Sequence, residues 1–467
     1  MAVARLIAVI YGIFYILGLY SPSRVTEERG VGNTESLGVG IIGLGVVGSG
    51  IINILADRQA YFKSVRGIDL VVQKIAVRDV AKKRSAEISP DLLTQDPKEV
   101  IHHPDVQIVI EVMGGIEPAR SYILETLESG KDVVTANKAL LAEHGDELFE
   151  TASTNCAGLA FEASVCGGIP IIRAITQGLP ANHVTSLYGI LNGTTNYILT
   201  KMTDEGGDFN QILKQAQDLG FAEADPTMDI DGTDAVQKLA ILCRLAFGVS
   251  IPYQSILKEG ITEVTAVDIA FARDLGYTIK LLGIARPGES GLEARVHPAL
   301  VPQDAILASI KDEFNAVEIV GDATGPQVYT GRGAGASPTA SAVVSDLLYQ
   351  AERRTAGRQK VSRQMVDVSK AEPRPPGDIQ TSYYCRFTVQ DTPGVLAHIA
   401  AIFSQHDISI ARVIQEGRSE IEGGAVPLIM TTHDASERAM RDASDEIGAL
   451  DVVKTTPQII RIEGLNG

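Results

Sequence analysis

The sequence predicts an α/β protein that begins with a parallel, doubly wound sheet and continues into two further α/β units. A short apolar run at 37–42 ends in three spaced glycines and leads into a helical pattern. Strand-like and helical segments then alternate as far as residue 135, an order typical of parallel sheets. At 467 residues the chain is too long for one ordinary core, so we expect about three domains.

The first unit has its opening strand at 37–42. After a tight turn, Ile51, Ile52 and Leu55 recur at helical spacing. Buried strands are expected at 70–77, 107–112 and 132–135, with a helix at 117–127 between the last two. This βαβαβ order predicts a Rossmann-type sheet with helices on both faces.

From residue 182 longer helices alternate with strands, which predicts a second α/β domain. Its helices are expected at 210–219, 234–247 and 265–275, and its strands at 186–191, 278–286 and 292–298. Residues 353–378 are rich in Arg, Lys and Pro, so a linker is expected there. The last module opens as βαββ, with strands at 383–389, 408–415 and 426–432 and a helix at 394–405.

Charge and cysteine usage exclude several classes of protein. The 41 basic and 58 acidic residues give a net charge of −17, and no Lys/Arg-rich run is present, so nucleic acid is not expected as a partner. The four cysteines show neither CxxC spacing nor a paired framework. We therefore expect a reducing, cytoplasmic compartment and no structural zinc site.

The turn after the first strand fits the pattern G-x-G-x-x-G, which is typical of dinucleotide binding. The first glycine permits the tight turn, the second lets a pyrophosphate approach the backbone, and the third lets helix and strand pack closely. The alternative is a merely glycine-rich turn, but strand, helix and sheet order all favour the cofactor. The expected contacts are Gly43, Leu44, Gly45, Val46, Val47 and Gly48.

The end of the second strand bears on cofactor choice. An NAD-preferring site would show Asp or Glu there, whereas this sequence has Arg78 followed by Asp79. Arg78 could pair with the 2′-phosphate of NADP, or it could be a surface residue paired with Asp79. We therefore expect NADP, with NAD as the alternative.

The densest group of charged residues suggests an amino-acid substrate. Asp234 and Lys238 are spaced i, i+4 near the start of a helix and project from one side of it. A plain salt bridge is one alternative, and a Ca²⁺ loop is disfavoured because the EF-hand order is missing. Carboxylates could hold an α-amino group, while a lysine could protonate an alkoxide. Within sixteen positions the cluster comprises Glu223, Asp225, Asp229, Asp231, Asp234 and Lys238.

This segment, GFAEADPTMDIDGTDAVQKL, closely resembles the signature of homoserine dehydrogenases. The resemblance spans roughly 37–350 and implies the NAD(P)-dependent interconversion of L-aspartate 4-semialdehyde and L-homoserine, in threonine, isoleucine and methionine biosynthesis. Further matches in order are GLGVVG, MGGIEP, TANK, FEASVCGGIPII, LNGTTNYIL and GRGAGASPTASAVVSD.

The resemblance also implies roles for single residues. Lys238 falls at the family's proton donor, Lys138 at its second active-site lysine near the nicotinamide, and Glu223 and Asp234 at the positions that bind substrate. The glycines matching those that line the cofactor are Gly114, Gly220 and Gly333.

A structural monovalent cation is implied by resemblance alone. Ligation by one carboxylate and several backbone carbonyls fits Na⁺ better than Zn²⁺. Without the resemblance, the sequence would favour a different role for Glu162: it would cap a helix, or it would be buried and paired with another residue. The matching positions are Glu162, Val165, Gly167 and Ile169.

The C-terminal module resembles an ACT domain, which has a ferredoxin-like fold. The resemblance covers 383–415 and includes a D-x-P-G turn ending at Gly394. Such modules commonly pair and bind amino acids, so we expect a homodimer or homotetramer with L-threonine as effector. A dimerisation module without ligand is the alternative. Because a Pro-rich linker precedes it, we expect the module to be removable without loss of activity.

The expected domain division follows from these matches. A nucleotide-binding domain occupies 37–170, a catalytic and dimerisation domain 171–350 whose last part, 331–350, returns to the nucleotide domain, a linker 351–380 and an ACT regulatory domain 381–467. Residues 1–36 form an extension with an apolar stretch at 6–23. It resembles a membrane or export signal, but no A-x-A-like cleavage site follows and the stretch falls short of the roughly 20 residues that span a bilayer. We favour a mis-assigned start or a weak anchor.

Two other functions compete with this interpretation. One is another NAD(P)-linked oxidoreductase of a small amino or hydroxy acid, and the other is a non-catalytic NADP-binding amino-acid sensor. The sensor is disfavoured because the polar residues that the chemistry needs are all present: Lys138, Glu223, Asp234 and Lys238.

Overall fold

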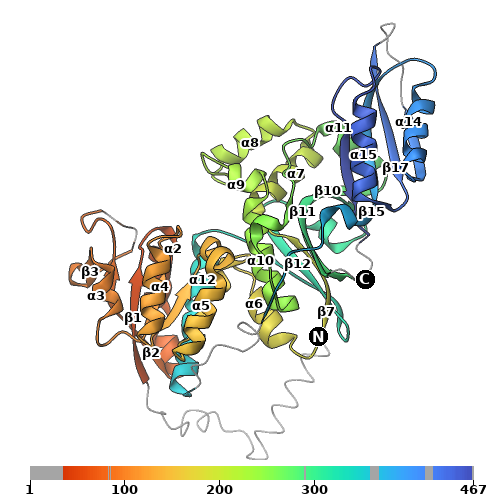
Figure 1. Ribbon diagram of the computed structural model, residues 1–467. Helices are drawn as coiled ribbons and strands as arrows, with labels where there is room; N and C mark the ends of the chain where they lie inside the picture. Colours follow the sequence, from red (N-terminus) through yellow and green to blue (C-terminus); the bar gives the residue numbers. More distant parts are fainter. Residues whose placement is uncertain are drawn as a thin grey trace, which may run out of the picture.

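The computed structural model describes residues 35–82, 84, 86–288, 291–357, 368–415 and 424–464. Three α/β units follow one another, coloured orange, green to teal, and blue (Figure 1). The apolar stretch expected at 6–23 lies outside the described residues. Within the part of the chain that is described, no helix is both long and apolar enough to cross a membrane.

The first unit is built on a six-stranded sheet in the order β3-β2-β1-β4-β5-β6, with every pair parallel. This order is that of a doubly wound nucleotide-binding sheet, and it confirms the expected fold class. The strands are β1 (Glu35–Ile42), β2 (Ile68–Ala76), β3 (Leu93–Thr94), β4 (Ile108–Glu111), β5 (Asp132–Thr135) and β6 (Leu159–Ala160). Its helices are α2 (Val46–Tyr61), α3 (Pro97–Ile101), α4 (Ala119–Glu128) and α5 (Lys138–Thr154).

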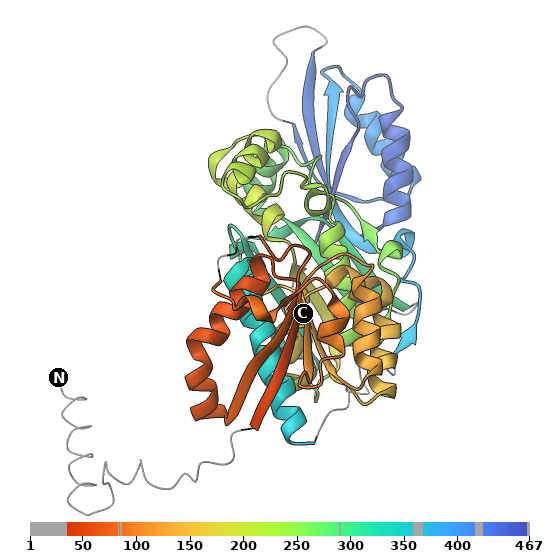
Figure 2. The ribbon, with the colours of Figure 1, turned by 90° about the vertical axis from the view of Figure 1, so that its left-hand side faces the viewer.

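A helix from much later in the chain completes this unit. Helix α12 (Ala336–Thr355) packs on α2 so closely that a Cβ on Gly50 would lie 3.0 Å from the Cβ of Ala340. Its buried side chains, among them Val343 and Leu347, belong to the core of the nucleotide-binding sheet. Figure 2 shows this cyan helix beside the orange and red strands. The helix continues to Thr355, inside the segment expected to be linker.

The second unit is a mainly antiparallel sheet with helices packed on it. Its strands are β7 (Val184–Ile190), β9 (Leu257–Lys258), β10 (Tyr277–Gly288), β11 (Gly291–Pro302), β12 (Phe314–Gly321) and β13 (Gly325–Arg332). The helices are α6 (Ile171–Arg173), α7 (Gly193–Glu205), α8 (Phe209–Asp218), α9 (Thr227–Ile230), α10 (Thr233–Phe247) and α11 (Ala266–Asp274).

The third unit covers one face of its sheet with two helices, as an ACT-type βαββαβ unit does (Figure 1). Its last strand lies between β15 and β11 of the second unit, antiparallel to β15 and parallel to β11. One sheet of eleven strands therefore runs through both units. The elements are β15 (Gln380–Gln390), α14 (Val395–Gln405), β16 (Ile410–Gln415), β17 (Ala425–Thr432), β18 (Ala435–Ser436), α15 (Glu437–Gly448) and β19 (Gln458–Ile462).

Buried ion pairs reinforce this shared sheet. Arg461 of β19 binds Glu259 of the second unit at 2.7 Å, and Arg386 of β15 binds Asp268 of α11 at 2.6 Å. Arg295 of β11, which is 0% exposed, pairs with Glu463. These pairs count against an easily removed module, because removal would leave Asp268 buried without its partner Arg386, and the expected retention of activity stays a prediction.

Part of the chain between the second and third units pairs with the body of the protein. The two-residue strand β14 (Ser369–Lys370) lies parallel to β8 (Val249–Ser250), directly after α10. This contact places Ser369 and Lys370 beside the second unit and, through the ion pair of Lys370 with Asp146, close to α5.

Candidate active site

The glycine-rich turn between β1 and α2 has a different environment at each glycine. Gly43 has a positive φ of 102°, and a Cβ there would meet backbone atoms of Val112 and Met113 at 2.8 Å. A Cβ on Gly48 would lie 2.6 Å from the carbonyl oxygen of Gly43. Gly45, in contrast, has no atom within 4 Å of its Cβ position, so the backbone there is open to a ligand.

The start of α2 is open as well. Its N-cap residue, Gly45, offers no side-chain hydrogen bond, so the first N–H groups of a 16-residue helix remain available to an anion. Of the expected contacts in this turn, Val46 is 72% exposed and Val47 lines the cleft described below. Leu44 is partly buried against the sheet core.

Arg78 lies two residues after the end of β2 and is exposed. Among the described residues its guanidinium makes no ion pair, and the carboxylate of Asp79 accepts a hydrogen bond from the backbone N–H of Ala81 at 2.9 Å. The expected alternative of an Arg78–Asp79 pair is thus not observed. The guanidinium stays available beside the strand that adjoins β1.

A cleft of about 870 Å³ opens between the nucleotide-binding unit and the second unit. We call it the central cleft. Its walls come from the start of α5, the start of α10, the loop after α8 and the loop after β13. Of the residues predicted from the sequence, those that line it are Val47, Lys138, Gly167, Gly220, Glu223, Asp234, Lys238 and Gly333.

Asp234 lies at the centre of the polar side chains in this cleft and is buried. Its carboxylate lies 2.7 Å from the Nζ of Lys238 and 3.2 Å from the Nζ of Lys138. Burial by itself would raise the pKa of Asp234, but the two ammonium groups outweigh it and lower the pKa to about 2. The carboxylate is therefore charged at every working pH.

Lys238 is held from two directions. Its ammonium donates to the carbonyl oxygen of Leu191 and to Asp234, each at 2.7 Å. Burial would lower the pKa of Lys238, yet the charge of Asp234 raises it above its usual value. The side chain is consequently a charged donor, and an ammonium has a third N–H for a ligand.

Asn192 and Asp229 also belong to the site: sequence reasoning gave Asn192 no role and named Asp229 only as a member of the acidic cluster. Asn192 caps α7 through its oxygen, and its amide donates to Asp229 at 2.7 Å and to Asp234 at 2.8 Å. Burial, followed by the charge of Asp234, raises the pKa of Asp229. An Asn ahead of a helix signals a cap, but only the fold brings its amide to the carboxylates.

The other predicted residues are placed less centrally. Glu223 is exposed at the rim of the cleft, in the loop that begins at Gly220. A Cβ on Gly333 would lie 2.1 Å from the side-chain carbon of Asn315, so only glycine fits there. Gly114 follows β4 with a φ of 73°, its N–H donates to Glu111, and it is not among the lining residues of the cleft.

The expected cation ligands form one buried turn. Glu162 accepts backbone N–H bonds from Ile172 at 2.7 Å and Arg173 at 3.1 Å, so it caps the short helix α6. Burial and the nearby Asp346 raise the pKa of Glu162 to about 7. The carbonyl of Ile169 accepts from Ile171.

A monovalent cation fits this turn. Each carboxylate oxygen of Glu162 keeps a second lone pair, and each backbone carbonyl has two, so these oxygens could still hold a cation. Val165 and Gly167 complete the turn, both buried. In the described part of the chain no group of three His, Cys, Asp or Glu side chains could hold a metal ion, which leaves carbonyl-rich ligation as the only type that this turn offers.

Comparison with known proteins gives a consistent result along the chain. Family models match for "Homoserine dehydrogenase, NAD binding domain" at 43–162, "Homoserine dehydrogenase" at 170–348 and "ACT domain" at 383–449. The homoserine dehydrogenases of Synechocystis sp. and Bacillus subtilis are 43% and 40% identical, and each alignment covers 91–92% of this chain and 99% of the relative.

Solved structures agree with these matches. A homoserine dehydrogenase from Thiobacillus denitrificans superposes with a TM-score of 0.85 at 41% identity, covering 92% of this chain and 99% of that one. A hyperthermophilic archaeal homoserine dehydrogenase in complex with NADPH superposes with a TM-score of 0.58 at 26% identity, covering 68% of this chain and 98% of that one.

Proposed function

The chain belongs to the homoserine dehydrogenase family, and on this premise we propose how its central cleft interconverts L-aspartate 4-semialdehyde and L-homoserine. The proposal rests mainly on one observation. The buried carboxylate of Asp234 pairs with two lysines, Lys138 and Lys238, where the nucleotide-binding and catalytic units meet. Neither another amino or hydroxy acid oxidoreductase nor a non-catalytic sensor is favoured, because homoserine dehydrogenases align with 91–92% of this chain.

Lys238 is the proposed proton donor. A nicotinamide bound in the central cleft would supply a hydride for the aldehyde carbon, and Lys238 would be placed to give a proton to the aldehyde oxygen as negative charge develops on it. Its raised pKa keeps it protonated for this role. In homoserine oxidation the same proton passes from the hydroxyl back to Lys238. Lys138, the second ammonium on Asp234, adds positive charge at the same place.

Two carboxylates are proposed to hold the substrate's ammonium group. Asp234 is charged and fixed, and Glu223 lies at the rim of the same cleft with its side chain exposed. Asn192 donates its amide to Oδ2 of Asp234, the oxygen that Lys238 also binds, and so helps to hold the carboxylate in place, while Lys138 lies 3.2 Å from Oδ1. A small zwitterion matches this arrangement of both charges.

The cofactor is a nicotinamide dinucleotide, and we propose that NADP is preferred. The open backbone at Gly45 and the uncapped start of α2 suit a pyrophosphate. Arg78 is free among the described residues to meet a 2′-phosphate. We also propose that three glycines border the rest of the cofactor. Gly220 and Gly333 line the central cleft, whereas Gly114 is not among its lining residues.

A structural Na⁺ is proposed at Glu162, Val165, Gly167 and Ile169. Support comes from a carboxylate with spare lone pairs beside a turn of backbone carbonyls. Protein in NaCl should unfold at a higher temperature than protein in tetramethylammonium chloride, and Glu162→Gln should remove the difference. An equal Tm in both salts for the native chain would count against the site.

The ACT domain is proposed to bind L-threonine, with the chain acting as a homodimer or homotetramer. Support comes from the start of α14, where Gly394 has a φ of 98° and no side chain caps the helix. Backbone N–H groups there could meet a carboxylate.

We propose the following division of the chain into domains. An extension at 1–36 precedes a nucleotide-binding domain at 37–170 and a catalytic domain at 171–350, of which 331–350 packs on the nucleotide-binding domain. A linker at 351–380 and the ACT domain at 381–467 follow.

One assay tests the function as a whole. The purified chain should oxidise L-homoserine with NADP⁺ or NAD⁺, and Lys238→Ala should lose about 10² to 10⁴ in kcat while keeping its affinity for NADPH. Protein that binds NADPH without oxidising homoserine would be a sensor. Near-normal turnover of Lys238→Ala would remove the assignment of the proton donor.

A further inference from the structure

Helices α5 and α10 meet side by side where the nucleotide-binding unit joins the second unit. Both begin at the central cleft: α5 starts with Lys138, and α10 carries Asp234 and Lys238 in its first two turns. The ion pair of Lys138 with Asp234, at 3.2 Å, joins the two starts. The side chain of Lys138 is 37% exposed, and an ion pair with a partly exposed lysine contributes little by itself.

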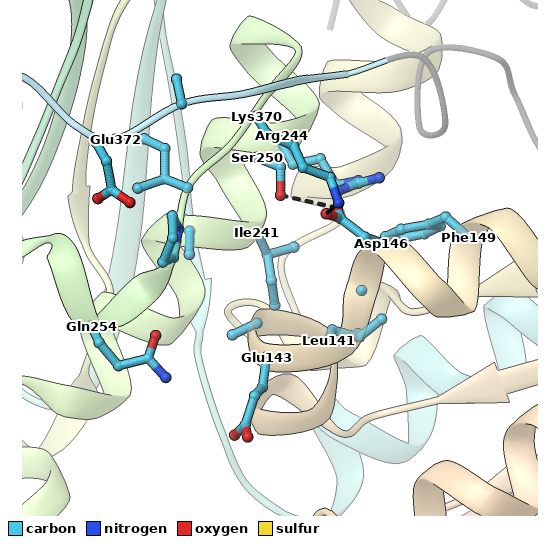
Figure 3. Close-up of a pocket in the computed structure, with 16 residues that line it drawn as sticks. Leu141, Glu143, Asp146, Phe149, Ile241, Arg244, Ser250, Gln254, Lys370 and Glu372 are labelled. Atoms are coloured by element: carbon cyan, nitrogen blue, oxygen red, sulfur yellow. Dashed lines mark hydrogen bonds and ion pairs between the residues drawn. The ribbon is translucent and has the colours of Figure 1, made fainter.

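The two helices are not packed tightly against each other. A cavity of about 410 Å³ lies between them, with Leu141 of α5 and Ile241 of α10 among its apolar lining residues (Figure 3). Helix α5 also departs from helical geometry at His144, where φ is −121° and ψ is 15°. Dense packing and an unbroken helix would both fix the start of α5, and neither is complete here. The position of Lys138 therefore depends on polar contacts between the helices.

A buried cation makes such a contact, two residues after the bend in α5. Arg244 of α10 forms an ion pair with Asp146 of α5, and its guanidinium lies over the ring of Phe149, 4.6 Å from the ring centre. The side chain of Arg244 is 8% exposed. Burial would raise the pKa of Asp146, but hydrogen bonds from Lys370 and Arg244 lower it to about 2. Both groups are therefore charged, and breaking a pair with a buried partner is strongly unfavourable.

This second ion pair lies away from the reacting groups. Asp146 and Arg244 come about two to three helical turns after Lys138 and Asp234, which places the two ion pairs about 12 to 15 Å apart along the helices. Neither Asp146 nor Arg244 lines the central cleft. One contact between two helices leaves them free to turn about it, whereas two contacts fix their relative direction.

We propose that Asp146 and Arg244 are positioning residues, which hold α5 along α10 so that the ammonium group of Lys138 stays at Asp234. The proposal rests on the catalytic role proposed above for Lys138. Without the pair, the start of α5 would shift relative to α10, and a displacement of about 1 Å in an active site can cost about 10²-fold in rate. Affinity for NADPH should change little, because the glycine-rich turn and α2 are elsewhere in the nucleotide-binding unit.

The first measurement follows Lys138 itself. The full-length chain is labelled by reductive methylation, and the label on each lysine is read by peptide mass spectrometry. The amine reacts only when it is free and deprotonated, so release from Asp234 in Asp146→Asn should raise the labelling rate of Lys138 up to about fivefold. Lys214, an exposed lysine of α8, is the internal reference and should react equally in both proteins. This measurement does not require catalysis, so it can fail or succeed independently of the proposed function.

The second measurement is a double-mutant cycle on kcat for semialdehyde reduction. Asp146→Asn should lower kcat about 10- to 10²-fold and leave the KM for NADPH close to the native value. In a Lys138→Ala chain the same substitution should change kcat by less than about twofold, because its effect would already be lost with Lys138. If Asp146 were needed only for stability, the two losses would multiply.

Glu147→Gln is the matched control, because Glu147 is the next residue of the same helix and binds Arg120 of α4 at 2.6 Å, inside the nucleotide-binding unit. It should lower the Tm without changing kcat or the labelling of Lys138. Lys370→Ala removes the exposed partner of Asp146, at 2.9 Å, and should change both readouts by less than about twofold.

Three results would overturn the proposal: unchanged labelling of Lys138 in Asp146→Asn, losses in kcat that multiply with those of Lys138→Ala, or an effect of Lys370→Ala as large as that of Asp146→Asn. Faster labelling with unchanged kcat would support the placement of Lys138 by Asp146 and would refute the catalytic role of Lys138.

Discussion

Replacing Asp234 with asparagine removes the charge at the centre of the central cleft and keeps the side chain's size. The native carboxylate lies within 3.2 Å of both lysine ammonium groups, and they lower its pKa from 3.8 to about 2 although burial opposes them. At 1.36 kcal/mol per pH unit, this shift corresponds to about 2 kcal/mol of net stabilisation of the charged form. The same attraction holds the proton on Lys238.

In Asp234→Asn, burial acts on Lys238 without its counter-charge, so the pKa of Lys238 falls. The proton donor is then lost as the pH rises. We expect kcat for semialdehyde reduction to fall by about 10² to 10⁴, with a larger loss at high pH than at low pH. The measurement is the rate of NADPH consumption across a pH series, with the KM for NADPH expected to stay close to the native value.

Asp225→Asn is the control for this variant. It removes a carboxylate from the same acidic segment, but that side chain is exposed and only binds Thr227. Its turnover should match the native protein. A loss in Asp234→Asn that is the same at every pH would show that the carboxylate does not act through Lys238, and retained turnover would refute the reasoning altogether.

Four further outcomes are expected. Arg78→Asp should narrow or reverse the preference for NADPH over NADH in KM, and an unchanged ratio would make Arg78 a surface residue. The full-length chain should bind L-threonine and be inhibited by it, and Gly394→Asp should weaken both effects; no binding by calorimetry at millimolar threonine would exclude this effector. A chain ending before β15 should have a clearly lower Tm, because Asp268 would lose the guanidinium of Arg386, at about 3 to 5 kcal/mol for a buried pair, and Arg295 would keep only Glu293 of its two carboxylate partners. A native Tm would show that β19 is dispensable. Deleting residues 1–36 should leave an active enzyme, as activity assays of the shortened chain can check.

Local patterns predicted the elements near the active site well. The strand at Asp132–Thr135 has the expected bounds, and α10 begins one residue before its expected start. The i, i+4 spacing of Asp234 and Lys238 predicted their contact, because side chains at this spacing are neighbours on the surface of a helix. The turn at Gly43 was predictable for the same reason, because its conformational demands are confined to a few adjacent residues.

Pairings between distant segments could not be predicted in this way. Lys138 meets Asp234 only because two units pack together, and Asn192 reaches the carboxylates from the end of another strand. The packing of α12 on α2 and the insertion of β19 beside β11 depend on which surfaces remain uncovered after each unit folds. A single sequence shows that these segments are apolar, but it does not show what covers them.

The place of β19 in the sheet also has a consequence for synthesis of the chain. Strand β19 leaves the ribosome after every other described strand, yet it pairs with β11, whose edge is made about 160 residues earlier. During that interval β9 pairs with β11 at Arg295 and Val296, but Ala299 and Leu300 on the same edge have no strand partner and Arg295 lacks Glu463. The catalytic sheet of a nascent chain is thus incomplete, with an edge open to chaperones or to other chains, until the regulatory domain has been translated.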